Sequence, residues 1–222
     1  MSLRFPATVR LVCLGLIAAG VLANASAESP SVAPSPYQSL FNGQNLEGWR
    51  GDERFWSVQD GAIVGETSKD NPAPHNTFLI RDGEFSDFEL RFSYQVSGFN
   101  SGIQYRSVAG DDFKVTGYQA DFEARWHDDG KKDKFTGMFF EEGGRMFMGQ
   151  RGDAVIVHTG SKPKKPVTTK IGTTGDSGEL ESVIKRDDWN EYVVVARGYT
   201  FTHIVNGRVM AVGYDEDTVH RR

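Results

Sequence analysis

Polar side chains of types used in catalysis recur at alternate positions in two segments of the sequence. They are Gln104 and Arg106 in the first segment and Gln119, Asp121 and Glu123 in the second. Successive side chains of a β-strand point to opposite faces, so each polar set would share one face. If the two strands are neighbours, a cation, two carboxylates and two amides converge, which suits proton transfer and the binding of hydroxyl groups. The alternative is a solvated outer face with cross-strand ion pairs.

Other chemistries find little support in the sequence. It has no Ser-His-Asp order, phosphate loop or His-Glu-x-x-His spacing, and its five histidines are scattered as surface or core residues usually are. The one cysteine, Cys13, lies near the N-terminus, so the rest of the chain has no thiolate nucleophile, disulfide or Cys-based zinc site. We predict no metal and no cofactor. Trp126 is an aromatic candidate for contact with a ligand.

The N-terminal residues have the pattern of a secretory signal peptide. Arg4 and Arg10 flank a short charged region, residues 11–22 are apolar, and Ala25-Ser26-Ala27 supplies the small residues of a cleavage site. The apolar run of 12 residues is shorter than the roughly 20 that a membrane-spanning helix needs. We therefore predict cleavage after Ala27, no membrane span in the mature protein, and export to the periplasm or the extracellular space.

The sequence after residue 27 predicts a short linker followed by one domain. Residues 28–36 are rich in Ser and Pro and predict a flexible linker, and residues 37–222 form the domain. Removing residues 1–27 takes away two of the 25 basic residues and none of the 30 acidic ones, so the net charge becomes 23 − 30 = −7. Nucleic acid is a poor partner for such a chain.

Strict alternation of apolar and polar residues predicts β-structure nearly throughout. Phe88, Leu90, Phe92, Tyr94 and Val96 share one face of a long strand. Asn-Gly at 206–207, between two apolar runs, predicts a hairpin because both turn residues need positive φ. Further strands are expected at 56–58, 62–65, 77–80, 102–106, 118–123, 137–140, 192–197 and 201–205.

One short helix and one long loop interrupt this pattern. Asp176 followed by Glu179 resembles a capping box, and Leu180, Val183 and Ile184 would lie on one face of a helix of about two turns. The Gly-, Thr-, Lys- and Pro-rich residues 160–178 predict a solvated loop around Lys162, Lys164 and Lys165. Many short strands with Gly-rich turns indicate an all-β fold, a jelly-roll sandwich of two antiparallel sheets.

Six segments in fixed order resemble the 3-keto-disaccharide hydrolase family, over nearly all of residues 39–213. They are LFNGQNLEGW at 40–49, W-SVQDGAIVGE at 56–66, DFELRFSYQV at 87–96, NSGIQYRS at 100–107, GYQADFE at 117–123 and DWNEYVVVARG at 188–198. The resemblance implies a concanavalin-like jelly roll that handles sugar on its concave face. It also implies hydrolysis of glycosides or disaccharides whose sugar carries a ketone at carbon 3.

The family resemblance gives the polar residues specific roles. Cleavage would begin with removal of the proton beside the ketone, with Asp121 or Glu123 as the base and Arg106 stabilising the enolate. Clustered carboxylates would allow a metal to take the place of Arg106. Gln104, Gln119 and Trp126 would bind the substrate, a small carbohydrate. The alternative is a non-catalytic carbohydrate-binding module, which needs aromatic rings and amides but no base.

The C-terminal residues depart from the family pattern. Family members usually continue beyond the Asn-Gly hairpin into two further strands, one of which carries a histidine in an apolar context. Here the polar run 215–222 follows the hairpin, and His220 is not in such a context. On this basis we expect a sandwich that lacks its C-terminal strands and exposes a sheet edge.

Overall fold

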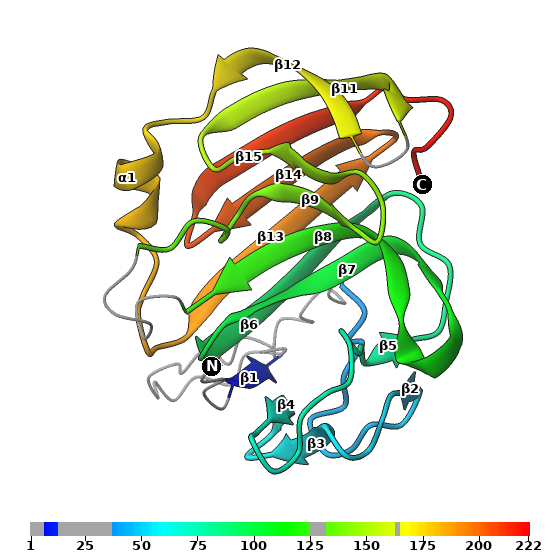
Figure 1. The fold of residues 1–222 in the computed structure, drawn as a ribbon. Coiled ribbons are helices and arrows are strands. Elements are labelled where there is room, and N and C mark those ends of the chain that lie inside the picture. Colours follow the sequence, from blue (N-terminus) through cyan, green and yellow to red (C-terminus); the bar gives the residue numbers. More distant parts are fainter. Residues whose placement is uncertain (1–6, 13–36, 125–131, 163–164) are drawn as a thin grey trace, which may run out of the picture.

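The structure is a computed structural model that describes residues 7–12, 37–124, 132–162 and 165–222. It is an all-β sandwich, as predicted (Figure 1). The larger sheet has the order β12 (Lys165–Thr173), β11 (Asp153–Lys162), β15 (Arg208–Asp215), β14 (Thr200–Val205), β13 (Asn190–Arg197), β6 (Phe88–Ser97), β1 (Ala7–Val12), β4 (Ala62–Thr67), β3 (Trp56–Gln59).

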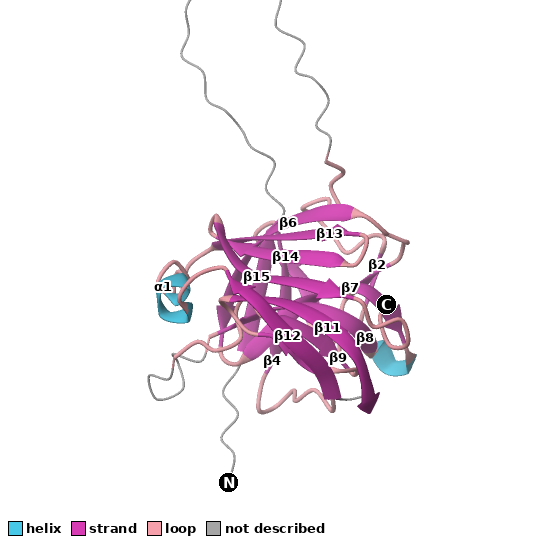
Figure 2. Ribbon diagram, turned by 90° about the horizontal axis from the view of Figure 1, so that it is seen from above, coloured by secondary structure: helices cyan, strands magenta, loops and turns pink. Residues whose placement is uncertain are grey.

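A smaller sheet packs on the larger one. Its order is β10 (Met146–Gly149), β9 (Phe139–Glu142), β8 (Val115–Glu123), β7 (Asn100–Ala109), and β2 (Trp49–Arg50) pairs separately with β5 (Ile80–Arg81). Strand pairing is antiparallel except between β11 and β15, which run parallel in the described part of the chain. The predicted sandwich of antiparallel sheets thus contains one parallel pair. Seen from above, the strands β6, β13, β14 and β15 of the larger sheet lie side by side (Figure 2).

Aromatic side chains fill the space between the sheets. Tyr94 from β6 stacks on Phe122 from β8 with ring centroids 4.3 Å apart, and Tyr118 from β8 meets Phe201 from β14 at 4.5 Å. All four side chains are buried in the core. Burying a large apolar side chain stabilises a fold by about 1.5–3 kcal/mol. These contacts fix the face of β8 that turns inward, and therefore the face that turns outward.

The short elements follow local signals in the sequence. The Asp176 carboxylate accepts hydrogen bonds from the backbone N–H groups of Gly178 and Glu179, so α1 (Ser177–Glu181) begins where the capping residue predicted. The helix has only 5 residues, fewer than the two turns expected. Asn206 and Gly207 have φ of 47° and 78° and join β14 to β15 as predicted.

Residues 160–178 do not form the predicted loop. Most of them complete β11 and build β12, whose side chains are mainly exposed at the edge of the larger sheet. An edge strand that buries neither face has no hydrophobic alternation to reveal it. Lys162 pairs with Lys165 at the end of this hairpin, and Lys164 lies outside the described residues.

Only residues 7–12 of the first 36 residues belong to the part of the chain that the structure describes. Residues 7–12, inside the predicted signal peptide, form β1 within the larger sheet, whereas the predicted linker 28–36 lies outside the described residues. Among the described residues, no helix combines the length and apolarity needed to cross a membrane.

Candidate active site

The outward face of β8 carries the polar residues that the sequence singled out. Tyr118, Ala120 and Phe122 turn into the core, so the alternating positions 119, 121 and 123 turn to the other side of the smaller sheet. Gln119, Asp121 and Glu123 are nevertheless buried, with 5%, 3% and 0% of their surface exposed. This covered polar face is unlike the solvated face with surface ion pairs that was the alternative interpretation.

A chain of hydrogen bonds leads from β7 across β8 to the Asp121 carboxylate. Gln104 lies opposite Gln119 in the ladder, and its side-chain amide donates to Oε1 of Gln119. The amide of Gln119 in turn donates to Oδ1 of Asp121. Opposite Asp121 stands Gly102, where a Cβ atom would lie 2.7 Å from Cγ of Gln119. Glycine at that position therefore leaves the space in which the Gln119 side chain lies.

The Asp121 carboxyl titrates in an unusual range. Its pKa is raised to about 7, mainly by burial and in addition by the nearby carboxylates of Glu123 and Glu142. Hydrogen bonds from Gln119 and Asn100 act in the opposite direction without cancelling the effect of burial. Near neutral pH such a carboxyl exists in both protonation states, as a group that accepts and returns a proton must.

Glu123 lies on the same face as Asp121 but has different hydrogen-bond partners. Its Oε1 accepts hydrogen bonds from the backbone N–H groups of Lys134 and Phe135, the latter at 3.1 Å, and its own N–H donates to Oγ1 of Thr136. Glu123 therefore anchors the turn at 134–136 on the end of β8. Of the two carboxylates, Asp121 is the one tied to the amide chain.

The structure does not bring Arg106 to this face, so the expected convergence was wrong for this residue. Its Nε donates to the Ser86 carbonyl at 2.9 Å, another nitrogen donates to the Gly198 carbonyl, and its guanidinium lies 5.2 Å from the Phe201 ring centroid. The ladder between β7 and β8 shifts register after Tyr105, and Arg106 adopts a φ of 46°. The bulge breaks the alternation that would have pointed Arg106 outward.

Aromatic rings continue the outer face of the smaller sheet beyond Gln119. Phe140 lies opposite Gln119 in the ladder, and Phe147 lies opposite Phe140. Phe147 contacts Phe140 edge to face at 5.1 Å and stacks on Phe135 at 5.7 Å, while 49% of its surface stays exposed. Sequence reasoning placed Phe140 in a strand but missed this surface, because Phe147 belongs to a strand that was not predicted. Trp126, the aromatic contact that was predicted, lies outside the described residues.

A histidine lies inside the core and away from this face. Nδ1 of His203 donates to the Met138 carbonyl at 2.9 Å, so Nε2 accepts from the Tyr105 hydroxyl, also at 2.9 Å. Burial lowers the pKa of His203 to about 4, which leaves it neutral. It is a core histidine with both nitrogens paired, in agreement with the general expectation for the histidines.

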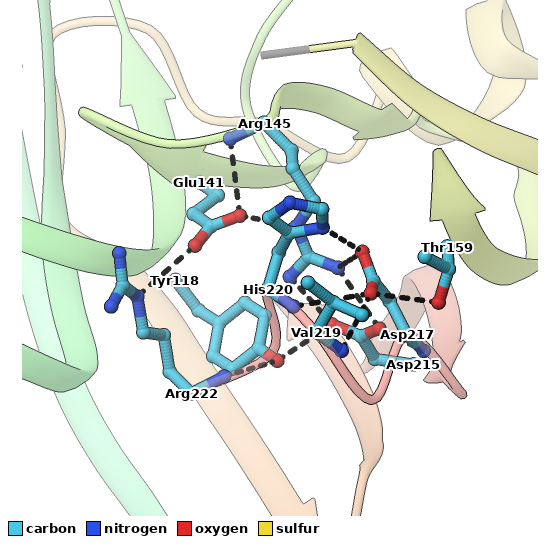
Figure 3. Close-up of polar contacts among 9 residues, drawn as sticks. All are labelled: Tyr118, Glu141, Arg145, Thr159, Asp215, Asp217, Val219, His220 and Arg222. Atoms are coloured by element: carbon cyan, nitrogen blue, oxygen red, sulfur yellow. Dashed lines mark hydrogen bonds and ion pairs between the residues drawn. The ribbon is translucent and has the colours of Figure 1, made fainter. Parts of the chain in front are cut away.

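A second polar cluster lies at one end of the core, around the buried Arg145 (Figure 3). Nε of Arg145 donates to Glu141 at 2.5 Å, and its two terminal nitrogens donate to Asp215 at 2.6 and 3.0 Å. Asp217 lies 3.3 Å from the same guanidinium. Three carboxylates thus surround one buried cation, and every side-chain nitrogen of Arg145 has an acceptor.

The same cluster holds the C-terminal residues on the sandwich. Asp217 accepts hydrogen bonds from Thr159, from the backbone N–H groups of Val219 and His220, and from Nδ1 of His220. Although burial opposes ionisation, these hydrogen bonds lower the pKa of Asp217 to about 2. The backbone N–H of Arg222 donates to the Tyr118 hydroxyl at 3.2 Å. Because the side-chain donors of Arg145 are all engaged by carboxylates, we interpret this cluster as a structural anchor for the C-terminal residues.

Comparison with known proteins adds one finding. The family model described as a 3-keto-alpha-glucoside-1,2-lyase-like domain matches residues 36–222. No curated protein matches the chain. Within the described ranges, no group of three or more His, Cys, Asp and Glu side chains is arranged to hold a metal ion.

Proposed function

Because the chain belongs to the 3-keto-alpha-glucoside-1,2-lyase-like family, we propose that it cleaves 3-keto-glycosides and that Asp121 is the catalytic base. The observation that carries this proposal is the Asp121 carboxyl, which is buried, hydrogen-bonded by Gln119 and titrates near pH 7. A carboxylate that served only to bind a hydroxyl group would need no such pKa.

The chemistry of a 3-keto sugar explains what such a base would do. The ketone at carbon 3 acidifies the proton on carbon 2, and Asp121 removes that proton to form an enolate. The enolate collapses with loss of the group at carbon 1, which leaves with the proton that Asp121 took from carbon 2. Addition of water to the resulting double bond completes a net hydrolysis. The raised pKa suits Asp121 to this step, because a base with a pKa near the working pH is strong while still partly ionised.

Two neighbouring features support a sugar ligand. The amides of Gln104 and Gln119 orient the Asp121 carboxylate from one side. On the other side of Gln119, Phe140 and the half-exposed Phe147 form an apolar surface. The C–H face of a sugar ring packs on such a surface, so we place the substrate across Gln119 with its carbon 2 toward Asp121.

The test compares the release of the carbon-1 group from a 3-keto-glucoside by the wild type, Asp121→Asn and Glu191→Gln. Glu191 is an exposed carboxylate on β13 of the other sheet and serves as the control. We expect Asp121→Asn to lower kcat by at least about a hundredfold, as loss of a general base does, and Glu191→Gln to leave kcat unchanged. Saturable binding of the sugar without turnover by the wild type would instead support a carbohydrate-binding module.

Export is part of the proposal and has its own measurement. The basic, apolar and small-residue segments of residues 1–27 support secretion with cleavage after Ala27. Mass spectrometry of the protein recovered from the exported fraction should give a chain that begins at Glu28. Recovery of the full-length chain in the cytoplasm alone would contradict export.

A further inference from the structure

A cleft of about 510 Å³ opens where three segments of the chain meet at one end of the sandwich. They are the segment 132–138, the residues at and after β10, and α1, which flanks the sandwich there (Figure 1). Small-molecule sites have volumes of roughly 300–1,000 Å³, so the cleft is large enough for a ligand of one or two rings.

The cleft adjoins the face that carries the proposed base. The backbone N–H of Gly137 donates to the carbonyl of Asp121 at 2.9 Å, and the N–H of Phe135 donates to Oε1 of Glu123 at 3.1 Å. Met138, the residue after Gly137, lines the cleft. Hydrogen-bonded neighbouring strands lie about 4.8 Å apart, so the wall of the cleft begins about one strand spacing from the backbone of Asp121.

Two aromatic rings form an apolar surface in the cleft. Phe135 and Phe147 both line it, and their rings stack with centroids 5.7 Å apart. Phe147 also contacts Phe140, the ring beside Gln119 on which the proposed function places the sugar. The Phe135–Phe147 pair therefore continues the proposed sugar surface and offers a flat area on which an aromatic ring can stack.

Most polar side chains of the cleft are already engaged with protein groups. Nη1 of Arg151 donates to Oδ1 of Asp133 at 3.0 Å, Nη2 donates to the Asp133 carbonyl at 2.8 Å, and Nε donates to the Ser177 carbonyl at 3.1 Å. The Glu181 carboxylate lies 3.6 Å from the same guanidinium. A sugar hydroxyl would have to displace one of these partners, a cost that disfavours a second sugar as the occupant.

The ammonium groups of Lys132 and Lys134 are the exception. Both side chains line the cleft and are exposed, and neither takes part in an ion pair within the part of the chain that the structure describes. With Arg151 they make three basic residues against the two acids Asp133 and Glu181, a local charge of 3 − 2 = +1 in a chain whose net charge is −5. The cleft therefore attracts an anionic group.

We propose that this cleft binds the group at carbon 1 of the substrate and that this group is an aromatic acid, a planar ring with an anionic substituent. The ring lies on Phe135 and Phe147, and the anion meets Lys132 and Lys134. The assignment to carbon 1 rests on the proposed cleavage at Asp121, whereas the chemistry of the ligand follows from the cleft alone. Binding of the free acid therefore tests the cleft separately from the reaction.

The first experiment measures binding of 4-hydroxybenzoate to the full-length protein by isothermal titration calorimetry. The comparison ligand is 4-hydroxybenzamide, which has nearly the same shape and no charge. We expect the acid to bind at least about tenfold more tightly than the amide, and added salt to reduce this ratio because it screens the lysines. No binding of the acid, or equal binding of the two, would overturn the proposal.

Variants then locate the ligand. Lys132→Met combined with Lys134→Met should lower the affinity for the acid to that for the amide, and Phe147→Ala should weaken the binding of both. All three side chains are exposed, so these substitutions leave the core intact. The matched control is Lys114→Met, an exposed lysine that precedes the opposite end of β8 and should change neither affinity. Wild-type affinity for the acid in the double lysine variant would refute this site.

The last measurement asks whether the cleft and the Asp121 face form one site. Asp121→Asn should bind 4-carboxyphenyl 3-keto-glucoside at least about tenfold more tightly than 4-hydroxybenzoate, because the sugar and the ring are held at once. Equal affinities would show that the cleft does not take the carbon-1 group. Release of 4-hydroxybenzoate from the glycoside reports on the proposed base, and affinity reports on the cleft, so failure of either proposal is recognised separately.

Discussion

At the scale of single residues, the hydrogen-bond partners and burial of a carboxyl group determine its role more than its place in the alternation of a strand does. Asp121 and Glu123 lie two residues apart on the same face of β8, yet the structure gives them different partners. Asp121 meets a side-chain amide, whereas Glu123 meets backbone N–H groups of a turn. A carboxylate held by backbone donors of a turn is an anchor, whereas a buried carboxylate whose amide hydrogen bonds do not offset the cost of burial retains its proton to higher pH.

The pH dependence of turnover follows from this difference. The proposed base Asp121 would act only when ionised, so kcat should rise with pH through about 7, the pKa of its carboxyl. Glu123 is one of the charges that raise this pKa. Glu123→Gln should therefore move the midpoint of the kcat–pH profile to lower pH. A midpoint that stays the same in Glu123→Gln would show that the titrating group is not Asp121.

The same carboxyl should also make stability depend on pH. Its folded pKa of about 7 lies above the ordinary value of 3.8, so its contribution to stability is complete below pH 3.8 and is lost as the pH rises through 7. The loss amounts to about 4 kcal/mol at most. Thermal unfolding should show Asp121→Asn to be more stable than the wild type at pH 8, with the gap narrowing toward pH 4. A gap that does not change with pH would contradict the raised pKa.

Arg106 should matter for stability and not for the chemical step. Its guanidinium bonds the carbonyls of Ser86 and Gly198 and packs near Phe201. Arg106→Ala should lower the free energy of unfolding by about 1–3 kcal/mol, as loss of charge-assisted hydrogen bonds does, while kcat per folded molecule is retained. Urea unfolding and active-site-normalised turnover measure the two effects. A large fall in kcat at full stability would restore the enolate-stabilising role that the sequence suggested.

At the scale of elements, the Arg145 cluster joins the C-terminal residues to the smaller sheet. Arg145 comes from the start of the β10 region, Glu141 from β9, and Asp215 and Asp217 from the end of β15 and the residues after it. The buried cation balances carboxylates from both sheets. Removing it leaves those carboxylates buried without their partner, which is costly because ions in the interior have lost their hydration.

Arg145→Met should therefore lower the free energy of unfolding by about 3–5 kcal/mol, measured by urea denaturation. The matched control is Arg91→Met, which removes an arginine from an exposed ion pair with Glu89 and should cost at most about 1 kcal/mol. Similar losses in the two variants would show that the cluster does not anchor the C-terminal residues.

At the scale of the whole molecule, the sequence predicted those elements that bury one face. The alternation from Phe88 to Val96 and the Asn206-Gly207 turn gave β6 and the β14–β15 hairpin, because side chains packed on one side leave a period of two in the sequence. Strands that do not bury one face and expose the other were not predicted. β12 is exposed at an edge, and β1 lies in a segment whose composition predicts a signal peptide.

The candidate site was predictable to the same extent. Alternation placed Gln119 and Asp121 on one face with Gln104, and the structure joins these three side chains by hydrogen bonds. The face on which Arg106 lies was predicted wrongly, because the β-bulge depends on local backbone conformation, which the alternation of residue types does not reveal. The Arg145 cluster could not have been foreseen, since Arg145 and Asp215 are 70 residues apart and meet only through the packing of two sheets.

Because β8 contributes to both the core and the candidate site, it should tolerate substitutions during evolution but not insertions or deletions. Between residues 118 and 123, the even-numbered positions pack into the core and the odd-numbered positions carry buried polar side chains, among them the proposed base Asp121. Single replacements can therefore alter one property and leave the other intact. Loss or gain of one residue within this segment exchanges the two sets, placing carboxylates against Tyr94 and aromatic rings where substrate would lie. Variation along this strand should consist of replacements, and lineages should differ in length only outside it.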